Sequence, residues 1–141
     1  MWFTEEFANK IGRITPSGVI TEFTAGISSN ANLVDIIGGP DGNVWFTEFG
    51  AGKIGRITPS GTVTEFSSGI TPGSNPAAIT SAEGAVWFVE FGAARVAKIS
   101  MAGHVTEYPS LGTTDSDMAT GPDSDLWITD FSGNGIVRVT E

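Results

Sequence analysis

The chain has 141 residues, and its composition already restricts the fold class and the kind of partner. Glycine occurs 19 times and proline 7 times, and the longest stretches without either are residues 1–11 and 27–37. Because an ordinary helix needs roughly ten to twelve uninterrupted residues, this distribution disfavours a helical bundle and favours many short strands. The net charge of −9 argues against nucleic acid or an anionic membrane as the partner.

Two absences in the given residues exclude further classes of protein. There is no cysteine, so a disulfide framework, a thiol nucleophile and a cysteine zinc site are all impossible. Neither an apolar stretch of about 18 residues nor a basic-then-apolar leader occurs, so we expect a soluble, cytoplasmic protein. The hydrophobic content of 40% is sufficient to bury a core, which predicts a single folded domain.

The chain contains an internal repeat of about 42 residues, marked by its four tryptophans. These are Trp2, Trp45, Trp87 and Trp127. The segments that begin there read WFTEEFANKIGRITPSGVITEF, WFTEFGAGKIGRITPSGTVTEF, WFVEFGAARVAKISMAGHVTEY and WITDFSGNGIVRVTE. The last three tryptophans each follow a turn sequence, GPDGNV, SAEGAV or GPDSDL. We expect the four tryptophans to pack between repeats, since they occupy equivalent positions.

One repeat is expected to form four short antiparallel strands joined by tight turns. In the repeat around Trp45 the predicted strands are 33–38, 44–49, 53–58 and 62–66, with Pro-Asp-Gly-Asn, Gly-Ala-Gly and Pro-Ser-Gly between them. Helix propensity over residues 93–102 is outweighed, because these residues align with strands in two sister repeats.

Apolar residues at both odd and even positions of the middle strands indicate a sheet that is buried on both faces. Sheets of this kind packed radially form a β-propeller, with four strands and roughly 40 to 50 residues per blade. A two-sheet sandwich is disfavoured, because nothing in that fold requires a repeat every four strands. We therefore predict an all-β chain of about 3.4 propeller repeats, an incomplete or half propeller. Full blades are expected at 32–67 and 76–109, with three strands at 1–24 and three at 116–141.

Such a chain does not form a closed ring, so the sheets at its two ends are expected to associate with other protein surfaces. The open ends would expose blade faces and strand edges, which predicts self-association, with a dimer favoured. A two-fold axis along the ring relates an even number of blades, so two copies could form six or eight blades but not a symmetric ring of seven. The alternative is that these residues are a piece of a longer propeller.

The phrase W-F-T-E-x-x-x-x-K-I-G-R-I-T-P-x-G-x-x-T-E-F, followed by G-P-D-G-N-V-W, resembles the repeat of the virginiamycin B lyase (streptogramin B lyase) family of propellers. The resemblance covers essentially the whole chain. It implies seven blades, roughly twice this length, and an active site at the central axis with a magnesium ion. The implied reaction is a metal-assisted elimination that opens the ester linkage of a cyclic depsipeptide.

The resemblance also implies histidines in a P-H-G-I or P-H-A-I phrase of a blade's first strand. The matching positions here are Val34, Ala77 and Ser116, so no catalytic histidine carries over, and we predict no catalytic or cofactor-binding residue. The family's metal-binding glutamates have weak counterparts in Glu48 and Glu90, which end second strands but have sisters in ordinary repeats. Magnesium is therefore expected only if the chain is part of a lyase.

The remaining polar candidates are predicted to be structural. His104 opens a fourth strand at the outer rim, where we expect a surface side chain. The basic residues lie in third strands between acids of the second and fourth strands, which predicts a cross-strand ladder of charges. Two acidic clusters, Asp115 with Asp117 and Asp123 with Asp125, do not match a calcium loop, and aspartates in turns usually cap backbone amides.

Two functions remain open from the sequence. The first is a noncatalytic propeller module that functions through self-association or through binding of a ligand at its axial face; it is favoured because no complete catalytic set is present. The second is a piece of a streptogramin B lyase-like enzyme, which would need a histidine general base near the axis.

Overall fold

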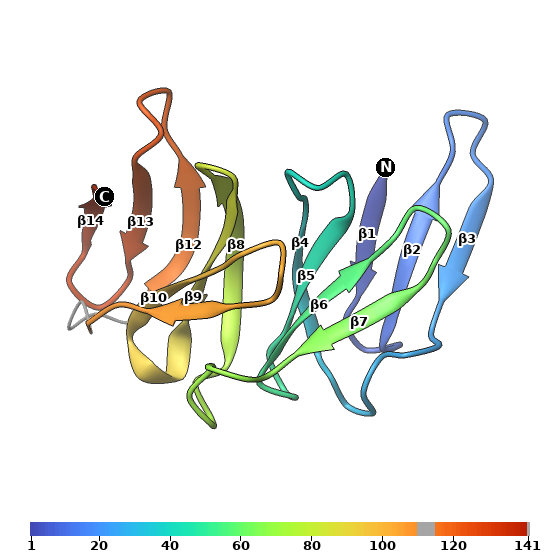
Figure 1. Cartoon of the computed structure of the whole chain (residues 1–141), viewed down its shortest axis with the longest axis horizontal. Coiled ribbons are helices and arrows are strands. Elements are labelled where there is room, and N and C mark those ends of the chain that lie inside the picture. The colour runs from blue at the N-terminus through green and yellow to red at the C-terminus, as the bar shows by residue number, and fades with distance from the viewer. Residues whose placement is uncertain (110–114, 141) are drawn as a thin grey trace.

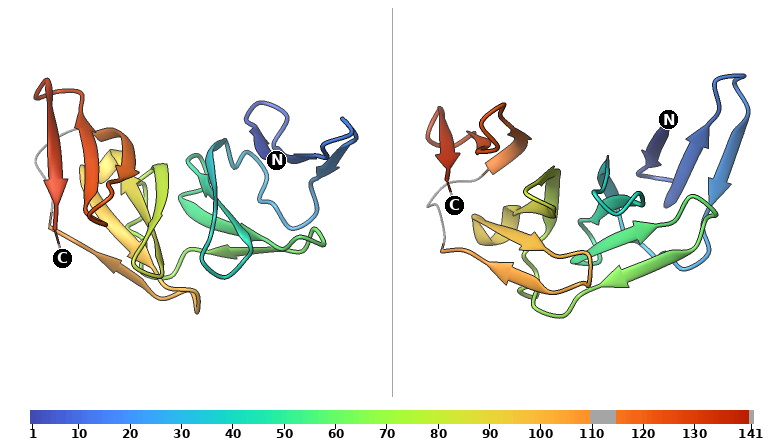
Figure 2. Two further views of the ribbon diagram at one scale, coloured as in Figure 1. Left: turned by 90° about the horizontal axis from the view of Figure 1, so that it is seen from above. Right: turned by 45° about the horizontal axis from the view of Figure 1, so that its top comes forward.

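The computed structural model describes residues 1–109 and 115–140, which form four antiparallel sheets arranged in an arc (Figures 1 and 2). The first sheet contains β1 (Trp2–Glu5), β2 (Lys10–Ile14) and β3 (Ile20–Phe23). The second contains β4 (Leu33–Gly38), β5 (Val44–Glu48), β6 (Lys53–Ile57) and β7 (Val63–Phe66). The third contains β8 (Pro76–Ala82), β9 (Ala85–Glu90), β10 (Arg95–Ile99) and β11 (Val105–Glu107). The fourth contains β12 (Asp115–Thr120), β13 (Leu126–Asp130) and β14 (Gly135–Val139). The predicted all-β fold class is confirmed.

Each strand has a fixed place in its sheet, and we name the strands by that place. The inner strands β4, β8 and β12 are neighbours along the concave side of the arc (Figure 2). They are followed outward by the second strands β1, β5, β9 and β13, the third strands β2, β6, β10 and β14, and the outer strands β3, β7 and β11. A single 3₁₀ turn, η1 (Phe91–Ala93), links β9 to β10, and the residues with helix propensity after it form β10. No helix in the described part of the chain has the length and apolarity to cross a membrane.

All four sheets share one register, so the sequence repeat is also a structural repeat. In each sheet the tryptophan of the second strand lies opposite the cation of the third strand. The pairs are Trp2 with Arg13, Trp45 with Arg56, Trp87 with Lys98, and Trp127 with Arg138. The cation lies over the indole ring in every sheet, 5.1 to 5.4 Å from its centroid.

The core consists of three apolar clusters, one between each pair of neighbouring sheets. The cluster between the second and third sheets joins Trp45 and Ile54 to Ile79 and Phe88, and similar clusters fill the other two interfaces. Trp45 is fully buried between the second and third sheets, and Trp87 is fully buried between the third and fourth. Trp2 is half-buried, and Trp127 is 40% exposed. The sheets are therefore held together by side chains that no single sheet could bury alone.

Candidate functional site

The axial face carries an open groove with a volume of about 370 Å³. Six residues from the first three sheets line it: Glu6, Asn32, Val34, Phe49, Ala77 and Phe91. They come from the links between second and third strands and from the beginnings of the inner strands β4 and β8. The lining is mainly apolar and aromatic, with one carboxylate and one amide at its edge, which is typical of small-molecule sites.

The two phenyl rings of the groove are held in place by backbone hydrogen bonds. The Phe49 N–H donates to the Asn32 carbonyl at 3.1 Å, and the Gly50 N–H donates to the Ala31 carbonyl at 2.9 Å. Asn32 has a left-handed backbone with φ of 52°, which directs its carbonyl toward the link. A Cβ at Gly50 would lie 2.6 Å from the Asn30 carbonyl oxygen, so only glycine allows this approach.

The same arrangement recurs around Phe91, one sheet further along the chain. The Phe91 N–H donates to Asn75 at 3.3 Å and the Gly92 N–H donates to Ser74 at 2.7 Å, with φ of 53° at Asn75. The ring centroids of Phe49 and Phe91 are 6.1 Å apart in a tilted arrangement. The repeat therefore positions two neighbouring rings side by side at the axial face.

A β-bulge in each inner strand determines which side chains reach the groove. The register shifts between Leu33 and Ile36 in β4 and between Pro76 and Ile79 in β8. Val34 and Ala77 lie inside these bulges and line the groove, which agrees with the tendency of bulges to re-aim a side chain next to a site. These are two of the positions matched to the family's histidines, so the groove wall here is apolar. The side chain of the third, Ser116, lies outside the described residues.

The sequence analysis missed the aromatic residues of this face, although a signal was available. A phenylalanine follows the acidic end of every second strand: Phe7, Phe49, Phe91 and Phe131. Phe7 and Phe131 are 97% and 81% exposed, whereas Phe49 is half-buried beside the ring of Phe91. The unused signal was an aromatic residue repeated at the link that follows each second strand, outside the strand pattern.

Glu48 and Glu90, the two metal candidates, end the second strands of the two complete sheets and are fully buried. Within residues 1–109 and 115–140, none of their four carboxylate oxygens has a hydrogen-bond partner. Burial, together with the nearby Glu65 carboxylate, raises the pKa of Glu48 to about 8. Burial, together with Glu107, likewise raises the pKa of Glu90 to about 7.

A cation from the chain itself lies beside each of these buried glutamates. Lys53 is opposite Glu48 in the sheet, and its Nζ donates to Glu65 at 2.6 Å and to Ser28 Oγ at 2.8 Å. The N–H of Ser28 also donates to Glu65, at 2.5 Å. The third sheet repeats the arrangement with Arg95, Glu107 and Thr71. The predicted charge ladder is thus confirmed by the Lys10–Glu22, Lys53–Glu65 and Arg95–Glu107 ion pairs.

The residues described here do not fit the magnesium ion that the family resemblance implies. No group of three or more His, Asp or Glu side chains within residues 1–109 and 115–140 is placed to hold a metal ion. Magnesium prefers an octahedral set of oxygens. Glu48 and Glu90 lie in separate sheets, each beside a lysine or arginine that supplies the positive charge.

The other polar candidates lie apart from the groove. His104 is exposed in the turn before β11, and its backbone N–H donates to Ser100 Oγ at 3.2 Å. Asp123 and Asp125 form ion pairs with Arg138. Asp117 accepts the Met118 N–H at 2.8 Å, as expected for a capping aspartate. The side chain of Asp115 lies outside the described residues.

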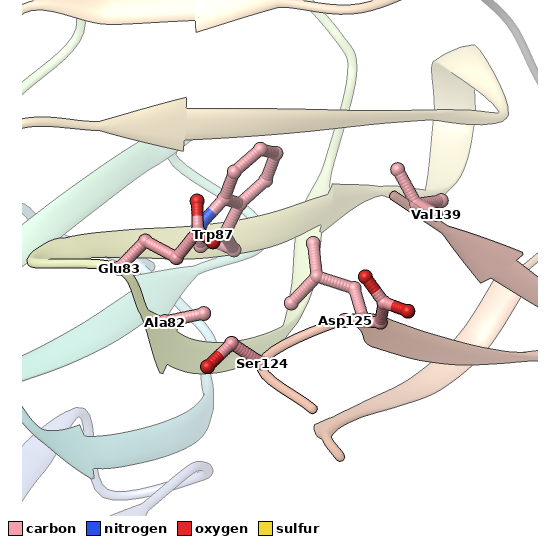
Figure 3. A pocket seen from close by; sticks show the side chains of 7 residues that line it. Ala82, Glu83, Trp87, Ser124, Asp125 and Val139 are labelled. Atoms are coloured by element: carbon pink, nitrogen blue, oxygen red, sulfur yellow. The ribbon is translucent and has the colours of Figure 1, made fainter. Parts of the chain in front are cut away.

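A second, small cavity lies between the third and fourth sheets (Figure 3). Its volume of about 10 Å³ is enough for about one water molecule. The indole N–H of Trp87, which lines this cavity, has no hydrogen-bond partner among the residues that the structure describes, whereas that of Trp45 donates to Asp41 at 3.0 Å. This cavity is too small for a ligand larger than water.

Comparison with known proteins relates this geometry to one family. The model of the virginiamycin B lyase family matches residues 1–141. Selenomethionine-substituted virginiamycin B lyase from Staphylococcus aureus is 38% identical with a TM-score of 0.92, over 99% of this chain and 48% of that one. A streptogramin B lyase structure is 35% identical with a TM-score of 0.91, over 99% and 47% of the two chains. None of the curated proteins compared with the chain matches it.

A catalytically inactive variant of the Staphylococcus aureus lyase, solved with quinupristin, is also similar, with 38% identity and a TM-score of 0.91 over 99% of this chain and 48% of that one. The chain thus spans about half the length of these solved relatives and forms part of a propeller of their kind. Because the family match extends over all four repeats, the chain belongs to the virginiamycin B lyase family.

Proposed function

We propose that the axial groove binds a cyclic depsipeptide of the streptogramin B type, and that this chain alone does not open its ester. The observation that carries the proposal is the pair of phenyl rings, Phe49 and Phe91, beside the apolar wall of Val34 and Ala77. Clefts of roughly 300 to 1,000 Å³ with such linings hold drug-sized ligands. The family match and the relative solved with quinupristin support the ligand class.

The noncatalytic part of the proposal rests on the lack of a positioned base. Abstraction of a proton requires a base within hydrogen-bond reach of the substrate. The bulge positions that line the groove carry Val34 and Ala77, and His104 lies in the turn that precedes the outer strand β11. Among the described residues that line the groove, Glu6 is the one acid, and it is exposed to solvent. Binding without ring opening is therefore expected.

Calorimetric titration with quinupristin tests the binding. We expect saturable binding that becomes about tenfold weaker in Phe49→Ala, because an aromatic contact is removed. The matched control is Phe131→Ala, the sister phenylalanine outside the groove, which should leave the affinity unchanged. No binding, or equal loss in both variants, contradicts the groove as the site.

Self-association is a second candidate function, favoured by the open faces of the two end sheets. Trp127 and Ile136 are 40% and 70% exposed, although their equivalents Trp45 and Ile54 are fully buried against the next sheet. At the other end Ile20 is 56% exposed, although its equivalent in β7 packs against the preceding sheet. The two open faces therefore carry equivalents of the residues that pack together at the interfaces inside the chain. The fourth sheet of one copy can pack on the first sheet of a second copy in the same way, which gives head-to-tail association.

Hydrogen bonds across the internal interfaces support the same pairing. Arg13 Nη1 donates to the Pro59 carbonyl of the next sheet at 2.7 Å, and Arg56 Nη1 donates to the Met101 carbonyl at 3.0 Å. The equivalent donor at the open end is Arg138, and the equivalent acceptor of a second copy is the Pro16 carbonyl. Sedimentation at micromolar concentration should show a dimer that Ile136→Glu dissociates. A monomeric wild-type chain contradicts this candidate.

The lyase alternative predicts a different product in the binding experiment. If the chain contributes half of a ring whose other blades supply histidines, the assembled ring should open the ester. Incubation of the chain with quinupristin and magnesium, followed by chromatography of the ligand, distinguishes the two. Recovery of intact ligand supports binding alone, and a ring-opened product supports the lyase.

A further inference from the structure

Bulges in the two inner strands that form the groove wall take backbone groups out of the regular hydrogen-bond ladder. The bulge of β4 contains Val34 and Asp35, and that of β8 contains Ala77 and Ala78, since the register shifts around each pair. The extra residue of a bulge is left unpaired within its sheet, and a polar backbone group in the interior needs another partner. The partners of these groups therefore identify the side chains that hold the groove wall.

Thr47 and Asp35 of the second sheet supply such partners. The fully buried hydroxyl of Thr47 donates to the Ala77 carbonyl at 2.7 Å and accepts the Asp35 N–H at 3.1 Å. One carboxylate oxygen of Asp35 accepts the Ile79 N–H at 3.0 Å, and the other accepts the Ile36 N–H at 2.8 Å. Two side chains of the second sheet thus hold the backbone of the third sheet on both sides of its bulge.

A comparable hydrogen bond reaches the other residue of the groove wall. Thr4 has the position of Thr47 in the first sheet, and its hydroxyl donates to the Val34 carbonyl at 3.4 Å. Val34 and Ala77 are the bulge residues that line the groove. Each has its carbonyl bound by a threonine of the preceding sheet. Because the backbone fixes the direction of Cβ, these bonds determine where the two side chains point.

The third sheet shows that neighbouring sheets can pack without such a pair. It has Ala78 and Val89 at the positions of Asp35 and Thr47. Both are buried in the apolar cluster between the third and fourth sheets. Apolar side chains at these positions are therefore sufficient to join two sheets. The hydrogen-bonding pair lies instead at the interface between the second and third sheets, which the groove crosses.

We propose that Thr47 and Asp35 are positioning residues of the groove. They fix the bulges of β4 and β8 relative to each other, and thereby set the spacing between the side chains of Val34 and Ala77 into which an apolar group of the ligand fits. This role rests on the proposed function, because it concerns the same groove, and adds to it the residues that shape the wall. A wall held in its binding geometry costs less ordering when a ligand binds.

Methyl relaxation by NMR tests the positioning without any ligand. Thr47→Val removes the hydroxyl at nearly constant volume and places in the second sheet the residue that the third sheet has there. We expect the order parameter of the Ala77 methyl to fall, and Thr47→Ser, which keeps the hydroxyl, to restore it. If Thr47→Val does not fold, Asp35→Ala provides the same measurement, since it frees the same bulge at Ile79. An unchanged order parameter overturns the positioning role.

Calorimetric titration with quinupristin tests whether the positioning serves binding. Thr47→Val should bind about tenfold more weakly than the wild type, and Thr47→Ser should recover most of the affinity. The matched control is Thr129→Val. Thr129 accepts the Asp117 N–H at 3.0 Å in the same way, but none of the described groove residues comes from the fourth sheet. Urea denaturation of each variant shows that it is folded under the conditions of the titration.

The outcomes distinguish the positioning role from the proposed ligand. A wild-type chain that does not bind quinupristin contradicts the proposed function, and the methyl measurement then decides alone whether Thr47 and Asp35 hold the bulge. Equal affinity of the wild type and Thr47→Val overturns the positioning role and leaves the groove as the binding site. An equal loss of affinity in Thr129→Val also overturns it, because the loss then does not depend on the groove wall.

Discussion

The complete sheets in the middle of the chain and the end sheets share one sequence repeat but differ in what that repeat buries. Trp45 and Trp87 are fully buried, whereas Trp127, at the same place in its sheet, is 40% exposed. Glu48 and Glu90 are fully buried too, whereas Glu5 is only partly so. Burial is therefore not a property of the repeat but of having a neighbour on both faces, as in solenoid and propeller repeats generally.

The largest expected difference in stability between the middle and end sheets comes from truncation of equivalent tryptophans. Trp45→Ala should lower the free energy of unfolding by about 3 to 5 kcal/mol, because it removes a large side chain from a closed interface. Trp127→Ala should lower it by about 1 kcal/mol, since its ring already contacts solvent. Urea denaturation measures both. Similar losses in the two variants would show that position in the repeat, and not the neighbouring sheet, sets the contribution.

The buried glutamates of the middle sheets should make the stability of the fold depend on pH, whereas the partly exposed Glu5 of the first sheet should not. Because the pKa of Glu48 rises from 4.5 to about 8 on folding, the folded state holds a proton that the unfolded state has lost between these values. Stability should therefore fall as pH rises through this window, by up to about 1.4 kcal/mol per pH unit. Glu48→Gln should reduce this slope and be more stable than the wild type at pH 8. Its control is Glu5→Gln, whose parent side chain contacts solvent; an equal effect there would contradict burial as the cause.

Equivalent glycines separate backbone strain from packing between sheets. Gly18 and Gly61 both have positive φ, 84° and 95°, but a Cβ at Gly61 would lie 2.4 Å from the Phe23 ring, whereas nothing lies within 4 Å at Gly18. Alanine at Gly18 should cost about 1 kcal/mol of strain. Alanine at Gly61 should cost about 1 to 3 kcal/mol more, because the ring must move from its stack. Thermal unfolding of the two variants measures the difference; equal costs would mean that the ring adapts freely.

The smallest expected effect concerns the turns before the second strands. Asp41 accepts hydrogen bonds from the Trp45 indole at 3.0 Å and from the Asn43 backbone at 3.1 Å. Asp41→Ala should cost about 1 to 2 kcal/mol, and Asp123→Ala in the open fourth sheet about 0.5 kcal/mol, since it loses an exposed ion pair. Denaturant midpoints compare the two, and Asp41→Asn, which keeps an acceptor, should recover part of the loss.

Much of the fold was predictable because turn residues and tryptophans recur at a fixed period. The predicted strand 33–38 coincides with β4, and the predicted strands 44–49 and 53–58 each end one residue beyond β5 and β6. The alignment of residues 93–102 with sister strands correctly outweighed their helix propensity, since β10 occupies Arg95–Ile99. Local turn chemistry and strand periodicity are properties of neighbouring residues, so one sequence reveals them.

Less of the candidate site was predictable, because its residues meet only across sheets. The bulges that aim Val34 and Ala77 at the groove depend on register, and the contact of Phe49 with Phe91 depends on the angle between two sheets. The environment of Glu48 was also missed: the sequence shows a repeated acid beside a repeated cation, which predicts an ion pair, and does not show that the carboxylate itself is fully buried.

The sequence by itself determined the all-β repeat, the approximate bounds of its strands and the family to which the chain belongs, because one repeat of about 42 residues contains the signals for each of them. The tertiary structure decided which copy of each residue is buried and which rings form the axial groove. The physical reason is that desolvation is set by neighbours from other repeats, so identical residues acquire different surroundings.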